Sequence, residues 1–153
     1  MAVVAGGVSI MIAASGRVYT CGWGDYGQLG HGDTEDQSTP KLVGALAGEQ
    51  VVDVCAGGSH TIAVTADGRA FSWGYGHGGQ LGHGEPAEHQ HTPKQITALA
   101  GHRIVRADAG ASHTIMVSAS GTVFSCGRNR YGHLGHGAKR ELLCGTSCAR
   151  YSA

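Results

Sequence analysis

A segment of about 52 residues occurs three times along the chain, and this repetition limits the fold more than any other feature of the sequence. The glycine-rich run CGWGDYGQLGHGD begins at Cys21 and returns as WGYGHGGQLGHGE from Trp73 and as CGRNRYGHLGHGA from Cys126. An upstream run, AGGSHTIAVTADG from Ala56, matches AGASHTIMVSASG from Ala109. A repeat of this length indicates structural units that stack on their neighbours.

Each copy carries the pattern of a small antiparallel sheet. In the second copy, residues 50–55 are rich in β-forming side chains. Residues 60–65 have the alternating pattern of a strand, with Ile62 and Val64 on one face. Asp67-Gly68 indicates a hairpin turn, which leads to a third strand over residues 69–73. The sequence therefore predicts three consecutive strands that pair in order.

Thr-Pro pairs predict a fourth strand, over residues 40–43 and 93–96, because proline excludes helix and suits a sheet edge. The third copy diverges after Gly137 without such a pair, so we expect its last strand to be missing. Sheets this small cannot bury their apolar faces alone. The predicted fold is all-β, a partial β-propeller of about three four-stranded antiparallel blades. The predicted boundaries are 3–50, 51–103 and 104–137 for the three repeats, and 138–153 for a divergent tail.

The ordered motifs resemble those of a known family. The Ser-His-Thr segment, the strand ending in Trp-Gly or Cys-Gly, the YGQLGHG run and the later Thr-Pro are similar to the repeat of the regulator of chromosome condensation family. The resemblance covers residues 3–137 and implies a seven-bladed propeller, of which this chain supplies about three blades. We therefore expect the chain to be a fragment, a truncated product, or a part that needs another chain to complete the propeller.

Composition excludes several partner classes. Eleven Lys and Arg balance eleven Asp and Glu, and only 14% of residues are charged, so we expect no direct nucleic-acid or membrane partner. No run approaches the roughly 18 apolar residues of a membrane helix. Five cysteines are an odd number, and Cys21 and Cys126 fall where another copy has Trp73, which indicates free thiols used in packing. We expect an intracellular protein, cytoplasmic or nuclear.

Glycine is unusually frequent, with 27 residues, and it creates two nucleotide-binding motifs by coincidence. Residues 22–27 and 74–79 satisfy G-x-G-x-x-G, but a dinucleotide site needs a helix next, and QLGHG cannot begin a stable one. Tight turns explain these glycines better, because glycine accepts positive φ without penalty. We expect no cofactor.

Ten histidines raise the possibility of a metal site, but their positions in the repeat argue against it. His31, His83 and His136 share one repeat position, and His60 and His113 share another, so each group is spread over several blades. We expect each of these histidines to form a hydrogen bond within its own blade. Two further pairs, His89-x-His91 and Cys144-x3-Cys148, supply too few ligands for structural zinc. No nucleophile motif or catalytic triad is recognisable, so we expect no enzyme activity.

The residues that vary inside the fixed glycine frame are the candidates for partner binding. Aromatic and arginine side chains on exposed loops are the types that anchor protein interfaces. Tolerated variation at the blade tips is the alternative explanation. The candidates are Trp23, Asp25, Tyr26, Tyr75, His77, Arg128, Arg130 and Tyr131.

These observations predict a non-enzymatic scaffold for protein–protein interaction. Members of the family include guanine nucleotide exchange factors for the small GTPase Ran, and ubiquitin ligases that carry such propellers. The resemblance therefore implies a protein partner, either a small GTPase or a ubiquitin-pathway protein. The alternative function is guanine nucleotide exchange on a small GTPase, although no residue here matches a motif assigned to that activity.

Overall fold

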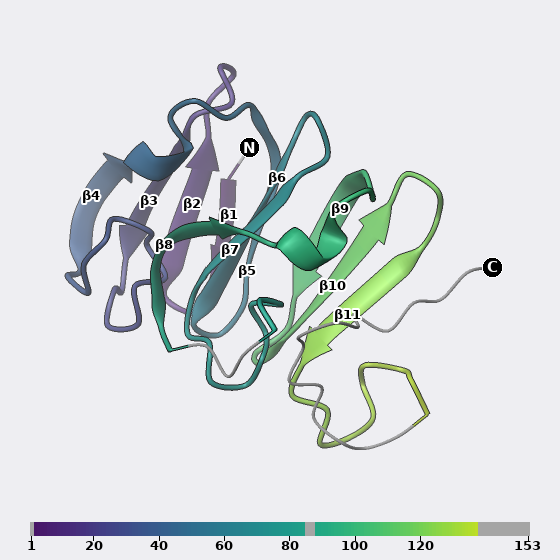
Figure 1. Cartoon of the computed structure of the whole chain (residues 1–153). Helices are drawn as coiled ribbons and strands as arrows, with labels where there is room; N and C mark the ends of the chain where they lie inside the picture. The colour runs from purple at the N-terminus through teal and green to yellow at the C-terminus, as the bar shows by residue number, and fades with distance from the viewer. Residues whose placement is uncertain (1, 85–87, 138–153) are drawn as a thin grey trace.

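A computed structural model describes residues 2–84 and 88–137, which form three antiparallel sheets arranged side by side like the blades of a fan (Figure 1). The first sheet contains β1 (Ala2–Ala5), β2 (Val8–Ile12), β3 (Val18–Gly22) and β4 (Gln37–Leu42). The second contains β5 (Val51–Ala56), β6 (His60–Thr65), β7 (Ala70–Gly74) and β8 (Gln90–Gln95). The third contains β9 (Ile104–Ala109), β10 (His113–Ser118) and β11 (Val123–Gly127).

The expected all-β partial propeller is confirmed, with strands that pair in chain order within each blade. Two short 3-10 helices, η1 (Gly44–Leu46) and η2 (Thr97–Leu99), join one blade to the next. Within the described residues the third blade has three strands, as the missing Thr-Pro pair predicts. The predicted tail over 138–153 lies outside the described residues.

The fourth strands begin three residues earlier than the Thr-Pro pairs suggest. β4 starts at Gln37 and β8 at Gln90, so Pro40 and Pro93 lie inside their strands. Both strands are edges, and the pairing of each with its neighbour shifts register across the segment that contains the proline. An edge strand with irregular pairing tolerates the missing proline N–H.

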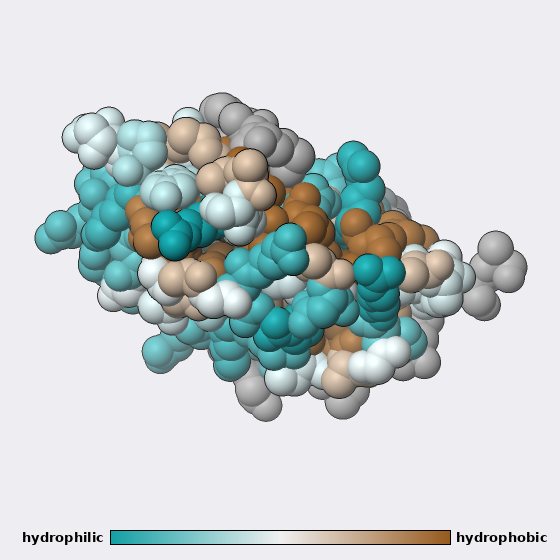
Figure 2. All heavy atoms as spheres, turned by 90° about the horizontal axis from the view of Figure 1, so that it is seen from above, coloured by the Kyte–Doolittle hydropathy of each residue, from teal (hydrophilic) through white to brown (hydrophobic). Residues whose placement is uncertain are grey.

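The hydrophobic core consists of two layers, each enclosed between neighbouring blades. Ile62 and Val64 of β6 belong to the layer shared with the third blade, and Phe71 and Trp73 of β7 to the layer shared with the first. The second blade is thus covered on both faces, and every residue of β6 and β7 is buried. Figure 2 views the molecule from the end of the hairpin turns, where brown apolar residues show between teal polar ones.

Backbone carbonyls in the QLGHG segments connect successive blades. The carbonyl of Gln28 accepts hydrogen bonds from the Thr61 hydroxyl at 2.9 Å and from Trp73 Nε1 at 2.8 Å. One blade further, the carbonyl of Gln80 accepts a bond from the Thr114 hydroxyl at 2.8 Å. These bonds are buried, so each blade provides hydrogen-bond acceptors for buried polar groups of the next blade.

This connection requires glycine at one position in particular. Gly30 has φ of +81°, and a Cβ atom added there would lie 2.8 Å from Trp73 Nε1. A side chain would therefore strain the backbone and displace the indole ring that bonds Gln28.

Three of the five histidines form hydrogen bonds within their own blade, as predicted. Nε2 of His31 lies 3.0 Å from the Thr20 hydroxyl, and Nε2 of His83 lies 3.0 Å from the Ser72 hydroxyl, each within its own blade. His136 contacts the Asn129 amide of its blade at 2.9 Å.

The prediction is wrong for His60, because its ring crosses to the next blade. Nε2 of His60 lies 2.9 Å from the Thr114 hydroxyl. That hydroxyl already donates to Gln80, so His60 must donate from Nε2 and hold Nδ1 unprotonated. Nδ1 is buried without a hydrogen-bond partner, and burial lowers the pKa of His60 to about 4, with His113 adding to the shift.

A pH dependence follows from the buried His60 ring. As pH falls from about 6.5 toward 4, His60 binds a proton in the unfolded chain but not in the folded chain, so the stability of the fold decreases. The full pKa shift of His60 corresponds to a loss of about 3 kcal/mol in the free energy of unfolding. We expect the difference in unfolding free energy between wild type and His60→Gln to shrink over this range, as measured by urea denaturation.

His77→Gln is the matched control, because His77 has an exposed side chain. Its unfolding free energy should follow the wild-type pH profile. A His60→Gln profile that is parallel to the wild type between pH 7 and 4 would show that His60 titrates normally in the folded protein.

Candidate partner-binding face

The long loops that follow the third strand of each blade lie at one end of the molecule, below the sheets in Figure 1. The hairpin turns β2–β3, β6–β7 and β10–β11 lie at the other end. We call the first end the loop face, formed by residues 23–36, 75–84, 88–89 and 128–137 and by the short turns 57–59 and 110–112. All eight predicted partner-binding residues belong to these loops.

Hydrogen bonds from side chains to the backbone hold these loops in place. The amide N–H of Gly24 donates to Asp36 Oδ1 at 2.8 Å, and that of Tyr26 donates to Gln28 Oε1 at 2.9 Å. In the third blade the amide N–H of Leu134 donates to Asn129 Oδ1 at 2.9 Å. The loops therefore present their side chains from a fixed backbone.

Four of the predicted residues meet in one aromatic group that spans two blades. Tyr26 packs edge-on against Trp23 and against Tyr75, with 5.2 Å between ring centroids in each case. Tyr75 contacts His77 at 5.4 Å. A fifth ring, His89, lies 5.1 Å from Tyr26, 5.0 Å from Tyr75 and 4.9 Å from His77. We call these five residues the ring cluster.

The sequence motifs raised His89 only as half of a His-x-His pair and did not predict its central place in the ring cluster. His89 lies twelve positions after His77 along the chain and has no counterpart in the glycine frame. Burial lowers the pKa of His89, and the neighbouring His77 and His91 lower it further, against an opposing effect of Glu88. Its Nδ1 is buried without a hydrogen-bond partner.

The predicted residues of the third blade form a separate, basic group. The Arg130 guanidinium lies over the Tyr131 ring at 5.6 Å, and Tyr131 is 76% exposed. Arg128 and Arg130 are both exposed. With Tyr131 they line a hollow of about 340 Å³, whose other walls are Ala111, Ser112, His113 and His133.

Arg128 connects this basic group to the ring cluster. It also lines a narrower cleft of about 220 Å³, together with Tyr26 and Tyr75 of the ring cluster. Asp25 is exposed and makes none of the ring contacts, so the structure groups seven of the eight predicted residues and leaves Asp25 apart.

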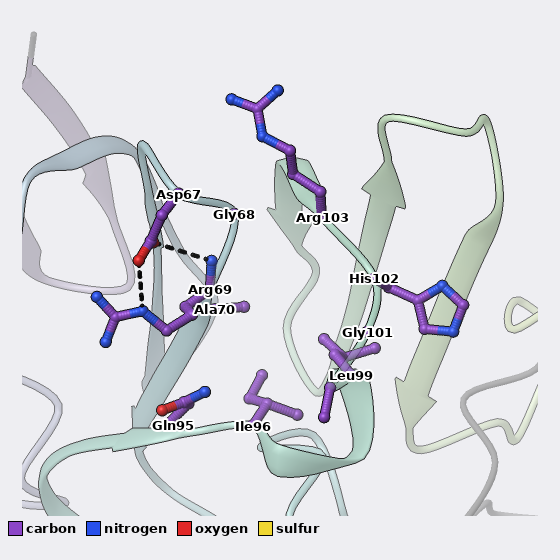
Figure 3. Close-up of a pocket in the computed structure, with 11 residues that line it drawn as sticks. Asp67, Gly68, Arg69, Ala70, Gln95, Ile96, Leu99, Gly101, His102 and Arg103 are labelled. Carbon is purple, nitrogen blue, oxygen red and sulfur yellow. Dashed lines mark hydrogen bonds and ion pairs between the residues drawn. The ribbon is translucent and has the colours of Figure 1, made fainter.

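Another hollow, of about 420 Å³, lies at the opposite end, beside the β6–β7 turn and η2 (Figure 3). Its charged groups already have partners. Arg69 Nε bonds Asp67 Oδ2 at 2.8 Å, and its Nη1 bonds Glu49 Oε1 at 3.0 Å. Arg103 donates to the Ala66 carbonyl at 3.0 Å. The bond from Arg103 joins the third blade to the second, and together these contacts leave little polar capacity for a ligand.

The described residues offer no metal centre, and the buried thiol of Cys55 is not activated. Among residues 2–84 and 88–137, no group of three or more His, Cys, Asp and Glu could hold a metal ion. Burial raises the pKa of the Cys55 thiol to about 12, helped by Asp108 and Asp53, so it is a poor nucleophile. The pair Cys144 and Cys148 lies outside the described residues. In the same part of the chain, none of the helices is long and apolar enough to cross a membrane.

Models of one protein family match most of the chain. A model described as regulator of chromosome condensation (RCC1) repeat matches residues 15–64, 67–117 and 120–146. A second model with the same description matches residues 51–80 and 104–132.

Curated proteins with similar sequences are much longer than this chain. The ultraviolet-B receptor UVR8 of Arabidopsis thaliana is 43% identical over 127 residues, which are 83% of this chain and 29% of that protein. The E3 ubiquitin-protein ligase HERC2 of Homo sapiens is 41% identical over 139 residues, which are 89% of this chain and 3% of the ligase. The protein RCC2 homolog of Danio rerio is 36% identical, over 88% of this chain and 27% of that protein. The chain thus spans less than a third of each of these relatives.

Solved structures show the same fold. Human WBSCR16 superposes with a TM-score of 0.79 at 29% identity, over 84% of this chain and 33% of that one. Prp20p of Saccharomyces cerevisiae superposes with a TM-score of 0.82 at 17% identity, over 97% of this chain and 38% of that one.

Proposed function

Because the chain belongs to the regulator of chromosome condensation repeat family, we propose that it is a non-enzymatic module that binds a protein partner through its loop face. The observation that carries this proposal is the ring cluster, which joins the loops of two blades. Proteins that share this repeat include receptors and ligases, so the repeat itself is compatible with a role in binding or regulation.

The ring cluster has the composition of an interface anchor. Aromatic side chains contribute large contact areas at low entropic cost, and such residues concentrate the binding energy of interfaces. Tyr26 contacts Trp23 of its own blade and also Tyr75 and His89, so it joins the first blade to the rest of the group. Fixed loop backbones lower the entropy that binding must overcome.

We place the partner among signalling or regulatory proteins, either a small GTPase or a ubiquitin-pathway protein. One relative is named as an E3 ubiquitin-protein ligase, and the structural neighbour Prp20p has binding properties toward Gsp1p and histones. Cys21, Cys55 and Cys126 are free thiols, which supports a reducing compartment, cytoplasm or nucleus.

Replacing Tyr26 tests the loop face. Gly78 stands in the second blade where Tyr26 stands in the first, so Tyr26→Gly inserts a residue that the repeat accepts. We expect at least tenfold less protein to be captured from an extract of the source cells, because the ring cluster loses three contacts. Quantitative mass spectrometry of the captured proteins is the measurement.

Arg103→Ala, at the opposite end of the molecule, is the matched control and should retain the wild-type partners. Equal capture by Tyr26→Gly and wild type would contradict binding through the loop face. A nucleotide-release assay on captured small GTPases separates the two functions: binding without acceleration supports the scaffold, and acceleration at catalytic concentrations supports exchange activity.

We also propose that further blades, supplied by another chain, cover the outer faces of the first and third blades. Ile115 and Val117 of β10 are half-buried, whereas Ile62 and Val64 occupy the same repeat positions in β6 and are fully buried. Half-exposed apolar strands favour association.

Light scattering on the purified chain tests this completion. We expect a mass above the 15.6 kDa of one chain, and a shift toward that mass for Ile115→Glu, because the charge opposes burial of the β10 face. Thr39→Glu on the exposed edge strand β4 is the control and should keep the wild-type mass. A wild-type monomer that unfolds cooperatively would contradict the proposal.

A further inference from the structure

We propose that the cleft between Tyr75 and Arg128 on the loop face binds a carboxylate side chain, Asp or Glu, of the partner protein. The inference rests on the proposed function, because it names the chemistry by which a partner is recognised. It concerns the cleft of about 220 Å³ that links the ring cluster to the basic group.

The size and lining of the cleft suit a single polar side chain. Its volume of about 220 Å³ is below the roughly 300–1,000 Å³ of typical small-molecule sites. One guanidinium and four residues with hydroxyl groups surround it, and hydroxyls donate readily to an anion. The lining residues are Tyr26, Ser59, Tyr75, Ala111, Ser112 and Arg128.

A departure from the repeat makes room for the Arg128 side chain that lines the cleft. Tyr26 and Tyr131 occupy the same position of the glycine frame in the first and third blades, whereas the second blade has Gly78. A Cβ atom added at Gly78 would lie 2.8 Å from Gln80 Oε1, 3.1 Å from Arg128 Cγ and 3.3 Å from Arg128 Nε, so the arginine extends across part of the space that a tyrosine would take. This arrangement brings the Arg128 side chain beside the second blade.

The positive charge in this region is uncompensated. Within residues 2–84 and 88–137, Arg69 and Lys41 form ion pairs, but no carboxylate pairs with Arg128 or Arg130. No Asp or Glu lines the cleft or the adjoining hollow of about 340 Å³. Asp108 lines a different hollow, together with His113. The region is therefore basic on a chain with zero net charge.

Guanidinium and carboxylate groups match in charge and geometry. Both are planar, and two parallel N–H···O bonds form between them, which makes this pair stronger and more specific than a neutral hydrogen bond. The rings of Tyr26 and Tyr75 form one wall of the cleft, so they reduce the access of water to such a pair. Phosphate shares the same acceptor chemistry, and the experiment must separate it from carboxylate.

Titration with acetylated hexaglutamate tests the site on the full chain. Two-dimensional NMR follows the amide signals of Ser112 and residue 128 as the peptide is added. We expect the dissociation constant to rise at least tenfold in Arg128→Gln, which removes the charge. Gly78→Tyr should give a similar loss while the Arg128 charge is retained, because the new ring takes the space that the Arg128 side chain occupies beside the second blade. Gly78 has no positive φ, and the atoms nearest to its new Cβ belong to the side chains of Gln80 and Arg128.

Arg103→Gln is the matched arginine control at the opposite end and should change the dissociation constant less than twofold. Equal losses in Arg128→Gln and Arg103→Gln, or wild-type binding by Gly78→Tyr, would overturn the proposal. Inorganic phosphate is titrated separately. Tighter binding of phosphate than of hexaglutamate at Ser112 would reassign the cleft to a phosphate group and overturn the carboxylate assignment.

Together, the hexaglutamate titration and the capture experiment distinguish a wrong carboxylate assignment from a wrong proposed function. If hexaglutamate does not bind but Tyr26→Gly still loses its captured partners, the loop face binds proteins and the carboxylate assignment is wrong. If hexaglutamate binds through Arg128 but Tyr26→Gly captures normally, the cleft is an anion site and partner binding through the ring cluster is wrong.

Discussion

The buried hydrogen bonds between successive blades are the contacts on which the rest of the structure depends. A four-stranded sheet of this size cannot bury its own faces, so each blade must pack against a neighbour, and packing alone would allow it to slide. The carbonyls of Gln28 and Gln80 fix the position of the next blade by accepting bonds from Thr61 and Thr114. A blade that shifted would lose its packing and these hydrogen bonds together. The loss would be large, because an unpaired buried carbonyl costs free energy.

The same contacts bring the loop residues of different blades together. Gln28 lies two residues after Tyr26, and Thr114 lies two residues after Ser112, so the bonds that join the blades are close to the loop face. Tyr26 meets Tyr75 across one junction, and Arg128 reaches Gly78 across the next. The repeat therefore supplies a constant frame, and the residues that vary within it define a surface that no single blade possesses.

The repeat predicted the strands, their order and the hydrogen bonds of His31 and His83, because these depend on contacts within one copy. It failed for contacts between copies. His60 was expected to bond within its blade and bonds Thr114 of the next. His89 was missed because its contacts with Tyr75 and His77 depend on how the returning part of the loop folds back, which no periodic signal records. The candidate loop residues were identifiable from their variation, but their division into an aromatic group and a basic group required the structure.

Site-specific photo-cross-linking tests the central claim, that the loop face binds protein partners, most directly. A benzoylphenylalanine residue placed at position 26 keeps an aromatic ring in the ring cluster, and one placed at position 103 lies at the opposite end. The account predicts that irradiation in the source cells yields covalent adducts with a defined partner from position 26 and none from position 103. Adducts with that partner from position 103 alone would contradict it.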